Sequence, residues 1–439
     1  MMKELSILML VSNRQDEVIR AIESLKPIRE AVSTELILVD TGCSKELRTE
    51  LEARGDKVIS FSWCNDFAKA RNAGLEIAEG KWFLFLDDDE FFEDAEEIIL
   101  FFKSGICEKF GFASYIVRNY LDFEGNTYTD SHVGRIAKRV PGLRFEGKIH
   151  EYMTGKVGEG IHLKARVGHF GYVFGSEEAR RKHFERNVSL IEEMIAEEPE
   201  QLHWGAQLIQ EYRAIEAFDE MISCAAKYLP LALEQKSHSI AGTFFCGMVI
   251  AYKGLKQYDM ACEWSRLTLS NPDISDMCKA FVSEMLAYAL FELGEFQEAF
   301  FYVKRYLESN SYFQDNPQAL SSQMDEIFVS EAFSKRRLEE AHSILICCDL
   351  LSGSTECLEK YAEELHWESS SVYVYEHMAE VLILAMNEMG PKECFLRIAR
   401  RIWSIGILHN YFVMQINEMA QNEDIRTAIA IFQQVDSER

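Results

Sequence analysis

Apolar residues fall along the first ninety positions in short runs separated by helical patterns. Three runs are typical of strands buried on both faces: Leu5–Val11, Glu35–Val39 and Trp82–Leu86. A further strand is expected at residues 57–61. Helical spacing of apolar positions is found at residues 16–25, 46–54 and 66–79. This alternation predicts an α/β fold with a mostly parallel sheet.

The strand at Trp82–Leu86 runs directly into Asp87, Asp88, Asp89 and Glu90. Carboxylates so close together repel one another, and a divalent cation with hard oxygen ligands relieves that repulsion. Strand alternation sends Asp87 and Asp89 to one side, so we expect this pair to face Mg²⁺ or Mn²⁺. The alternative interpretation is an acidic cap on the following helix.

Ligands of parallel α/β sheets bind beyond the carboxyl ends of the strands. Asp40 ends the predicted strand Glu35–Val39, just as Asp87 ends Trp82–Leu86. We therefore expect Asp40 and the acidic run to converge on one crevice.

Strand patterns disappear after residue 176, and helices of about a dozen residues are expected instead. Residues 252–261 and 291–299 are similar, each with aromatic residues, a glycine and a final alanine. Aromatic residues between helices and small residues at helix crossings are what stacked helical hairpins require. We expect residues 1–180 to form the α/β domain and residues 181–439 an all-α, tetratricopeptide-like domain, with an irregular helical bundle as the alternative.

Composition narrows the classes of function. The formal net charge is −26 over 439 residues, so nucleic acid and anionic lipid would be repelled, and we expect no nucleic-acid partner. The eleven cysteines show no C-x-x-C spacing, which fits a reducing cytosol. We find neither a signal-peptide pattern nor a run long enough for a transmembrane segment. The expected location is cytoplasmic.

Residues 135–166 reverse the local charge, with eight basic against three acidic side chains. Such a basic segment suits a diphosphate leaving group, although a solvated surface is the alternative. It contains His150 and Glu151, and His169 follows shortly after it.

Four segments carry a resemblance to a known family: residues 39–44 (VDTGCS), 65–72 (NDFAKARN), 86–89 (LDDD) and 145–151 (FEGKIHE). In order and spacing they resemble the family 2 glycosyltransferases of GT-A fold. With the helical region added, the chain is similar to the bacterial branch that includes the S-glycosyltransferases of glycocin peptides. The resemblance is strong over about residues 4 to 175 and only architectural beyond.

The resemblance implies an inverting, metal-dependent transferase that uses a UDP-sugar. Asp40 would hold the uracil, Arg71 would touch uracil or diphosphate, and Asp87 would reach the ribose. The implied nucleotide-sugar set also includes Ser12 and Asp88. The implied metal set is Asp89 with His150 or His169, binding Mg²⁺ or Mn²⁺, and Glu151 is the implied general base. The chain departs from the family pattern at Arg14, where an acidic residue is common, and at Cys43 and Lys45.

We expect transfer of a hexose or N-acetylhexosamine to an acceptor presented by the helical domain, which could also pair two copies as a homodimer. The acceptor could be a peptide Cys or Ser, a cell-envelope glycan or a lipid-linked sugar. A glycoside hydrolase also needs paired carboxylates but has no use for the nucleotide set of Asp40 and Arg71. A helical-repeat binding protein with an inactive transferase domain is a further alternative.

Overall fold

The computed structural model describes residues 3–120, 122–126, 128–171, 173–316, 319, 332–367, 372–421, 425 and 427. The chain divides into two compact units, Met1–Gln207 and Leu208–Arg439. The division falls inside helix α7 (Leu202–Ala214), later in the chain than the boundary expected between residues 180 and 181.

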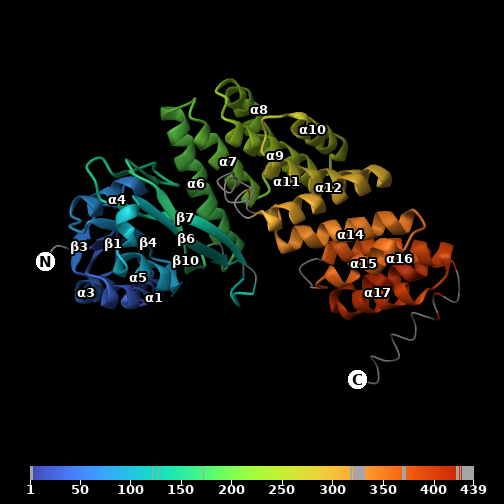
Figure 1. The fold of residues 1–439 in the computed structure, drawn as a ribbon, viewed down its shortest axis with the longest axis horizontal. Coiled ribbons are helices and arrows are strands. Elements are labelled where there is room, and N and C mark those ends of the chain that lie inside the picture. The colour runs from blue at the N-terminus through green and yellow to red at the C-terminus, as the bar shows by residue number, and fades with distance from the viewer. Residues whose placement is uncertain are drawn as a thin grey trace, which may run out of the picture. The chain divides into compact units, whose positions relative to one another are not determined.

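An eight-stranded mixed sheet, in the order β3-β2-β1-β4-β7-β6-β10-β5, forms the centre of the first unit (Figure 1). Strands β3, β2, β1 and β4 are parallel, and the antiparallel strand β7 joins them to the rest. The strands are β1 (Leu5–Val11), β2 (Thr34–Asp40), β3 (Lys57–Ser60), β4 (Trp82–Asp87), β5 (Glu90–Asp94), β6 (Phe112–Tyr120), β7 (Tyr128–Lys138) and β10 (Gly160–His169). Strands β8 (Arg144–Glu146) and β9 (Tyr152–Thr154) form a separate hairpin. The predicted α/β class is confirmed.

Alternation along β1 shows how the sheet is covered. Leu5, Ile7 and Met9 enter a core formed with one group of helices, whereas Leu8 and Leu10 enter a second core on the other face. The first core includes residues of α1 (Gln15–Ser24), α2 (Lys26–Ala31), α3 (Lys45–Arg54) and α5 (Glu96–Lys103). The second includes α4 (Phe67–Glu76) and the β8–β9 hairpin. Burial on both faces explains why these strands are continuous apolar runs.

The second unit is helical throughout its described part, which confirms the predicted all-α region (Figure 1). Helices α9, α11, α14 and α16 pack successively against one another. Helix α6 (Glu177–Glu197) belongs to the first unit, and the second contains α8 (Phe218–Glu234), α9 (His238–Gly254), α10 (Tyr258–Ser270), α11 (Asp276–Glu292), α12 (Phe296–Asp315), α14 (Lys335–Leu351), α15 (Glu356–Tyr361), α16 (Val372–Met389), α17 (Glu393–Ser404) and α18 (His409–Met419). In the part of the chain described, every helix is too short or too polar to cross a bilayer.

The two similar segments noted in the sequence occupy equivalent places in successive helical hairpins. Residues 252–261 span the turn from α9 to α10, and residues 291–299 span the turn from α11 to α12. Their final alanines, Ala261 and Ala299, are fully buried. Small side chains therefore lie where helices approach closely, and the tetratricopeptide-like character itself stays a prediction.

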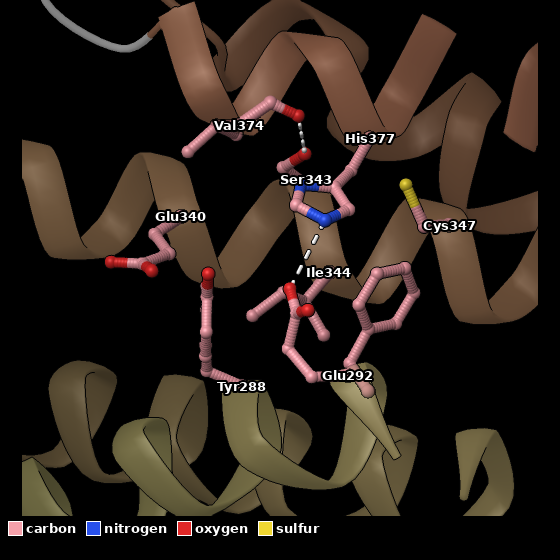
Figure 2. Close-up of a pocket in the computed structure, with 9 residues that line it drawn as sticks. Tyr288, Glu292, Glu340, Ser343, Ile344, Cys347, Val374 and His377 are labelled. Carbon is pink, nitrogen blue, oxygen red and sulfur yellow. Dashed lines mark hydrogen bonds and ion pairs between the residues drawn. The ribbon is translucent and has the colours of Figure 1, made fainter. Parts of the chain in front are cut away.

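A small cavity lies between α11, α14 and α16 (Figure 2). Tyr288 and Ile344 help to line it, and an ion pair between His377 Nε2 and Glu292 Oε1 spans 3.0 Å at its edge. The cavity volume of about 20 Å³ holds roughly one water molecule. It is therefore too small for a sugar or nucleotide.

Asn72 on α4 fixes the β8–β9 hairpin to the first unit. Its Nδ2 donates to the carbonyl of Phe145 at 2.9 Å, and the N–H of Phe145 donates to its Oδ1 at 2.8 Å. At the start of the same helix, the N–H of Phe67 donates to the carbonyl of Lys148 at 2.9 Å. These bonds set the path of the chain that leads to Glu151.

We predict that Asn72→Ala lowers the free energy of unfolding by about 1–3 kcal/mol, because both main-chain groups of the buried Phe145 lose their partner. Urea denaturation followed by circular dichroism measures the change. The control is Asn126→Ala in an exposed loop, expected to stay within about 0.5 kcal/mol of wild type. Equal stability of the two variants would contradict the role of Asn72.

Candidate active site

The acidic run forms the turn between β4 and β5. Strand β4 ends at Asp87, Asp88 and Asp89 make the turn, and Glu90 begins β5. The N–H of Asp87 donates to Glu90 Oε2 at 3.0 Å, which closes this turn. Strand alternation therefore stops at Asp87. Asp87 and Asp89 contact different cations rather than acting as one pair.

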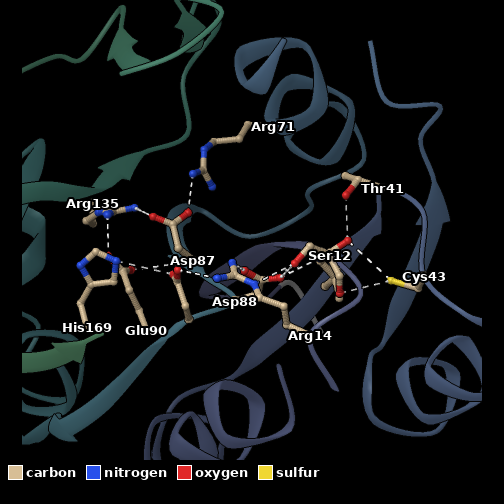
Figure 3. A network of polar contacts seen from close by, with 12 residues as sticks. Ser12, Arg14, Thr41, Cys43, Arg71, Asp87, Asp88, Glu90, Arg135 and His169 are labelled. Carbon is tan, nitrogen blue, oxygen red and sulfur yellow. Dashed lines mark hydrogen bonds and ion pairs between the residues drawn. The ribbon is translucent and has the colours of Figure 1, made fainter. Parts of the chain in front are cut away.

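Two buried arginines hold the carboxylate of Asp87. Arg71 Nη2 donates to Oδ1 at 2.5 Å and Arg135 Nη1 to Oδ2 at 2.9 Å (Figure 3). Both guanidinium groups lie against the ring of Phe85, at 4.5 and 4.4 Å from its centre. Although burial works in the opposite direction, the two arginines hold the pKa of Asp87 well below its usual range.

The same arginines extend the network to two more carboxylates. Arg71 Nε contacts Glu151 Oε1, and Arg135 Nη2 donates to Glu90 Oε1 at 2.7 Å. Burial raises the pKa of Glu90, and the charge of Arg135 opposes that shift. Among the described residues, Arg71 Nη1 is buried without a hydrogen-bond acceptor. Glu151 is thus brought from a distant loop to the carboxyl end of β4.

Asp88 joins the end of β4 to the end of β1. Its Oδ2 accepts from both the N–H and the hydroxyl of Ser12, each at 2.7 Å (Figure 3). Its Oδ1 contacts Arg14 Nη2. Asp88 and Ser12, both expected to bind the nucleotide-sugar, therefore bind each other in this structure.

Asp89 is the acidic residue of this turn that lies beside a histidine. Its Oδ1 is 3.8 Å from His169 Nε2, and its Oδ2 accepts from Arg14 Nη1 at 2.9 Å. His169 Nδ1 lies 2.7 Å from Asn119 Oδ1, which can only accept, so in the neutral imidazole Nδ1 would carry the proton and Nε2 would face Asp89. Burial lowers the pKa of His169, with Asp89 acting against the shift.

This donor set fits a divalent ion. A carboxylate oxygen and a neutral imidazole nitrogen, oriented through its other nitrogen, are ordinary ligands. Two protein ligands leave positions for diphosphate oxygens, which is how Mg²⁺ is commonly held. Of the two predicted histidines, His169 is the one that reaches Asp89. His150 lies near His203, whose pKa is lowered by burial and then by the charge of His150.

Asp40 closes the turn that follows β2. Its Oδ1 accepts from the N–H groups of Gly42 and Cys43 at 2.9 and 2.7 Å, and its Oδ2 accepts from Arg48 Nη1 at 2.9 Å. Burial alone would raise its pKa, but these donors lower the pKa of Asp40 to about 2. Both oxygens thus have protein partners, and the uracil-binding role stays a prediction.

The sheet places Asp40 and Asp87 at the same edge. Val11 pairs with Asp40, and Leu10 pairs with Asp87, so the two aspartates flank the end of β1. Both acidic segments therefore lie at the carboxyl ends of neighbouring parallel strands, and the crevice expected between them stays a prediction.

Glu90, Asn119 and Arg135 take part in the site without a distinct signal in the sequence. Glu90 was counted with the acidic run, and Arg135 was one of eight cations in the basic segment. Their roles depend on β5, β6 and β7 being neighbours of β4 or β10, and the sequence does not give that strand order. A signal for Arg135 was available only in its charge.

Comparison with known proteins finds a family match in the N-terminal region and two partial relatives. Residues 6–105 match the family model "Glycosyl transferase family 2". The chain is 26% identical over 168 residues to the SPbeta prophage-derived glycosyltransferase SunS of Bacillus subtilis, covering 38% of this chain and 39% of that protein. A TPR repeat-containing protein of Synechococcus elongatus is 25% identical over 228 residues, covering 48% and 53%.

Similarity to solved structures is low. The S. aureus TarS structure aligns with a TM-score of 0.32 and 14% identity over 59% of this chain and 54% of that one. Glucosyl-3-phosphoglycerate synthase from Mycobacterium tuberculosis, solved with Mn²⁺, UDP and glucosyl-3-phosphoglycerate, aligns with a TM-score of 0.23 and 17% identity over 26% and 44%. The chain thus spans well under two thirds of the length of these relatives.

We predict that Asp40→Asn lowers the free energy of unfolding by about 1–2 kcal/mol near pH 6. Because the folded-state pKa of Asp40 is lowered to about 2, its contribution is present above the unfolded-state pKa of about 3.9 and is lost as the pH falls toward 2. The difference from wild type should shrink below about pH 4.

Urea denaturation at a series of pH values measures this difference. Glu124→Gln, a change in an exposed loop, is the control and should stay within about 0.5 kcal/mol of wild type at each pH. A difference for Asp40→Asn that is constant from pH 6 to pH 3 would show that the Asp40 charge is not stabilising.

Proposed function

We propose that this chain, which carries a family 2 glycosyltransferase domain in its N-terminal region, transfers a sugar from a UDP-sugar with inversion at the anomeric carbon. The observation that carries the proposal is the meeting of Asp89 with His169, and of Asp87 with Glu151 through Arg71, at one edge of the sheet. Asp89 and His169 offer ligands for a divalent ion that binds the diphosphate. Glu151 offers a carboxylate that can take the proton of the acceptor.

The chemistry needs one bond to form as another breaks. The acceptor oxygen or sulfur bonds to the anomeric carbon, the bond from that carbon to the diphosphate oxygen breaks, and UDP leaves with the electron pair. Glu151 takes the acceptor proton on Oε2, since Arg71 contacts Oε1. The acceptor then attacks from the face opposite the diphosphate, as inversion requires.

Cationic groups at the site support departure of a diphosphate. A divalent ion held by Asp89 and His169 would supply positive charge to the leaving group. Arg71 adds a permanent charge with a buried N–H that has no acceptor among the described residues. We assign Asp40 to the uracil and Asp87 to the ribose. On binding the nucleotide, each carboxylate would exchange one of its present protein partners for a group of the nucleotide.

The acceptor is assigned to the helical region. We assign transfer of a hexose or N-acetylhexosamine to a peptide Cys or Ser, with the helical region selecting the acceptor and able to pair two copies as a homodimer. Stacked helical hairpins expose extended surfaces suited to such binding. A cell-envelope glycan or a lipid-linked sugar is the competing acceptor.

We predict that Asp89→Asn weakens UDP binding in the presence of Mn²⁺ by roughly 10- to 100-fold, because a ligand that is a charged oxygen becomes neutral. His169→Gln should act in the same direction. Isothermal titration calorimetry with UDP, with Mn²⁺ and then with EDTA, measures both. The control Asp130→Asn alters a carboxylate that pairs with Arg118 and should bind as wild type. If EDTA leaves the UDP affinity unchanged, the assignment of Asp89 and His169 as metal ligands is wrong.

We predict that Glu151→Gln lowers the rate of UDP release from a UDP-sugar by roughly 10²–10⁴-fold with water as acceptor, while UDP affinity changes little. The amide oxygen can still accept from Arg71, so the geometry is retained. Glu146→Gln, on the same segment and paired with Arg144, is the control. With a thiol acceptor, the deficit should be smaller and should shrink as pH rises toward about 8.5. Wild-type turnover by Glu151→Gln at every pH would exclude Glu151 as the base.

A further inference from the structure

Arg14 occupies the acidic turn in a way that the proposed function does not explain. It immediately precedes α1, where the helix dipole disfavours a positive charge. Its guanidinium nevertheless points away to the turn between β4 and β5, and 46% of its side chain is exposed (Figure 3). A cation placed here against the dipole must be stabilised by the carboxylates that it contacts.

The contacts of Arg14 divide into a buried side and an exposed side. On the buried side, Nη2 contacts Asp88, whose side chain is 6% exposed and is fixed by Ser12. Arg14 Nε donates to the Ser12 hydroxyl at 3.0 Å. On the more exposed side, Nη1 donates to Asp89 Oδ2 at 2.9 Å. One end of the guanidinium is anchored, and the other neutralises the proposed metal ligand.

We propose that Arg14 couples the binding of the divalent ion to the binding of the nucleotide diphosphate, an inference that rests on the proposed function. While Arg14 holds Asp89, a divalent ion that binds Asp89 Oδ1 and His169 Nε2 is repelled by the guanidinium on the same carboxylate. The ion alone therefore binds weakly.

A diphosphate removes this competition. Its oxygens accept charge-assisted hydrogen bonds from a guanidinium, so Nη1 can leave Asp89 for the diphosphate while Nη2 stays on Asp88. Asp89 is then released for the ion, and the ion and the diphosphate neutralise each other. Each ligand thus raises the affinity for the other, as reciprocity of coupling requires.

The charges and the exposure of the arginines agree with this coupling between the ion and the diphosphate. Three guanidinium groups, those of Arg14, Arg71 and Arg135, face five carboxylates, those of Asp87, Asp88, Asp89, Glu90 and Glu151. Arg71 and Arg135 are 4% and 11% exposed, whereas Arg14 is 46% exposed, so Arg14 is the arginine of the three that a ligand entering from solvent can contact.

The test measures Mn²⁺ affinity by the paramagnetic resonance signal of free Mn²⁺, first without nucleotide and then with saturating UDP. We expect UDP to tighten Mn²⁺ binding to wild type at least about 10-fold. In Arg14→Met, Mn²⁺ alone should bind several-fold more tightly than to wild type, and the gain from UDP should fall. Arg14→Lys, which keeps the charge but reaches fewer oxygens, should lie between the two.

Arg118→Met is the matched control, because Arg118 makes a two-bond pair with Asp130 and does not contact the acidic turn. It should bind Mn²⁺ and UDP as wild type does. Mn²⁺ affinity without UDP that is unchanged or lower in Arg14→Met would overturn the inference. So would wild-type protein that binds UDP by calorimetry but has the same Mn²⁺ affinity with and without UDP. Wild-type protein that binds Mn²⁺ but no UDP would instead refute the proposed function.

Discussion

Repulsion between carboxylates at the end of β4 is the constraint on which the rest of the N-terminal unit depends. Asp87 alone contacts two arginines, Arg71 from helix α4 and Arg135 from strand β7 of the sheet. Stacking of both guanidinium groups on Phe85 fixes their positions before any ligand is present. Electrostatic preorganisation of this kind avoids the cost of reorienting charges during a reaction. Arg71 and Arg135 therefore stabilise the close approach of the carboxylates of this site.

The relation between sequence and structure differs from one part of the site to another. Strands β1, β2 and β4 were predicted within about two residues, because buried parallel strands are continuous apolar runs. Asp40 and Asp87 were correctly placed at one edge, since the sheet there is parallel. The strand alternation used to pair Asp87 with Asp89 stops at Asp87, where β4 ends, so their shared role at a metal stays a prediction. In the two-residue turn of Asp88 and Asp89, side chains no longer alternate between the two faces of the sheet.

Contacts between distant segments could not be derived from local patterns. Glu151 meets Arg71 because Asn72 and the β8–β9 hairpin hold the intervening chain, and neither the hairpin nor this asparagine was predicted to do so. His169 was named through a family resemblance, whereas its place beside Asp89 depends on β10 pairing with β5. The role of the basic segment toward a diphosphate stays a prediction. Of its cations, Arg135 reaches the acidic turn, whereas Lys148 pairs with Glu193 and Glu197 on helix α6.

The family match and the site have different extents along the chain. The matched residues 6–105 contain Asp40, Arg71 and the acidic turn, but Arg135, Glu151 and His169 lie beyond them. A fragment that stops at the end of the match would leave Asp87 with one of its two cations and Asp89 without its imidazole. The proposed site therefore extends to strand β10, and any division or fusion of this chain must keep that strand together with the matched residues.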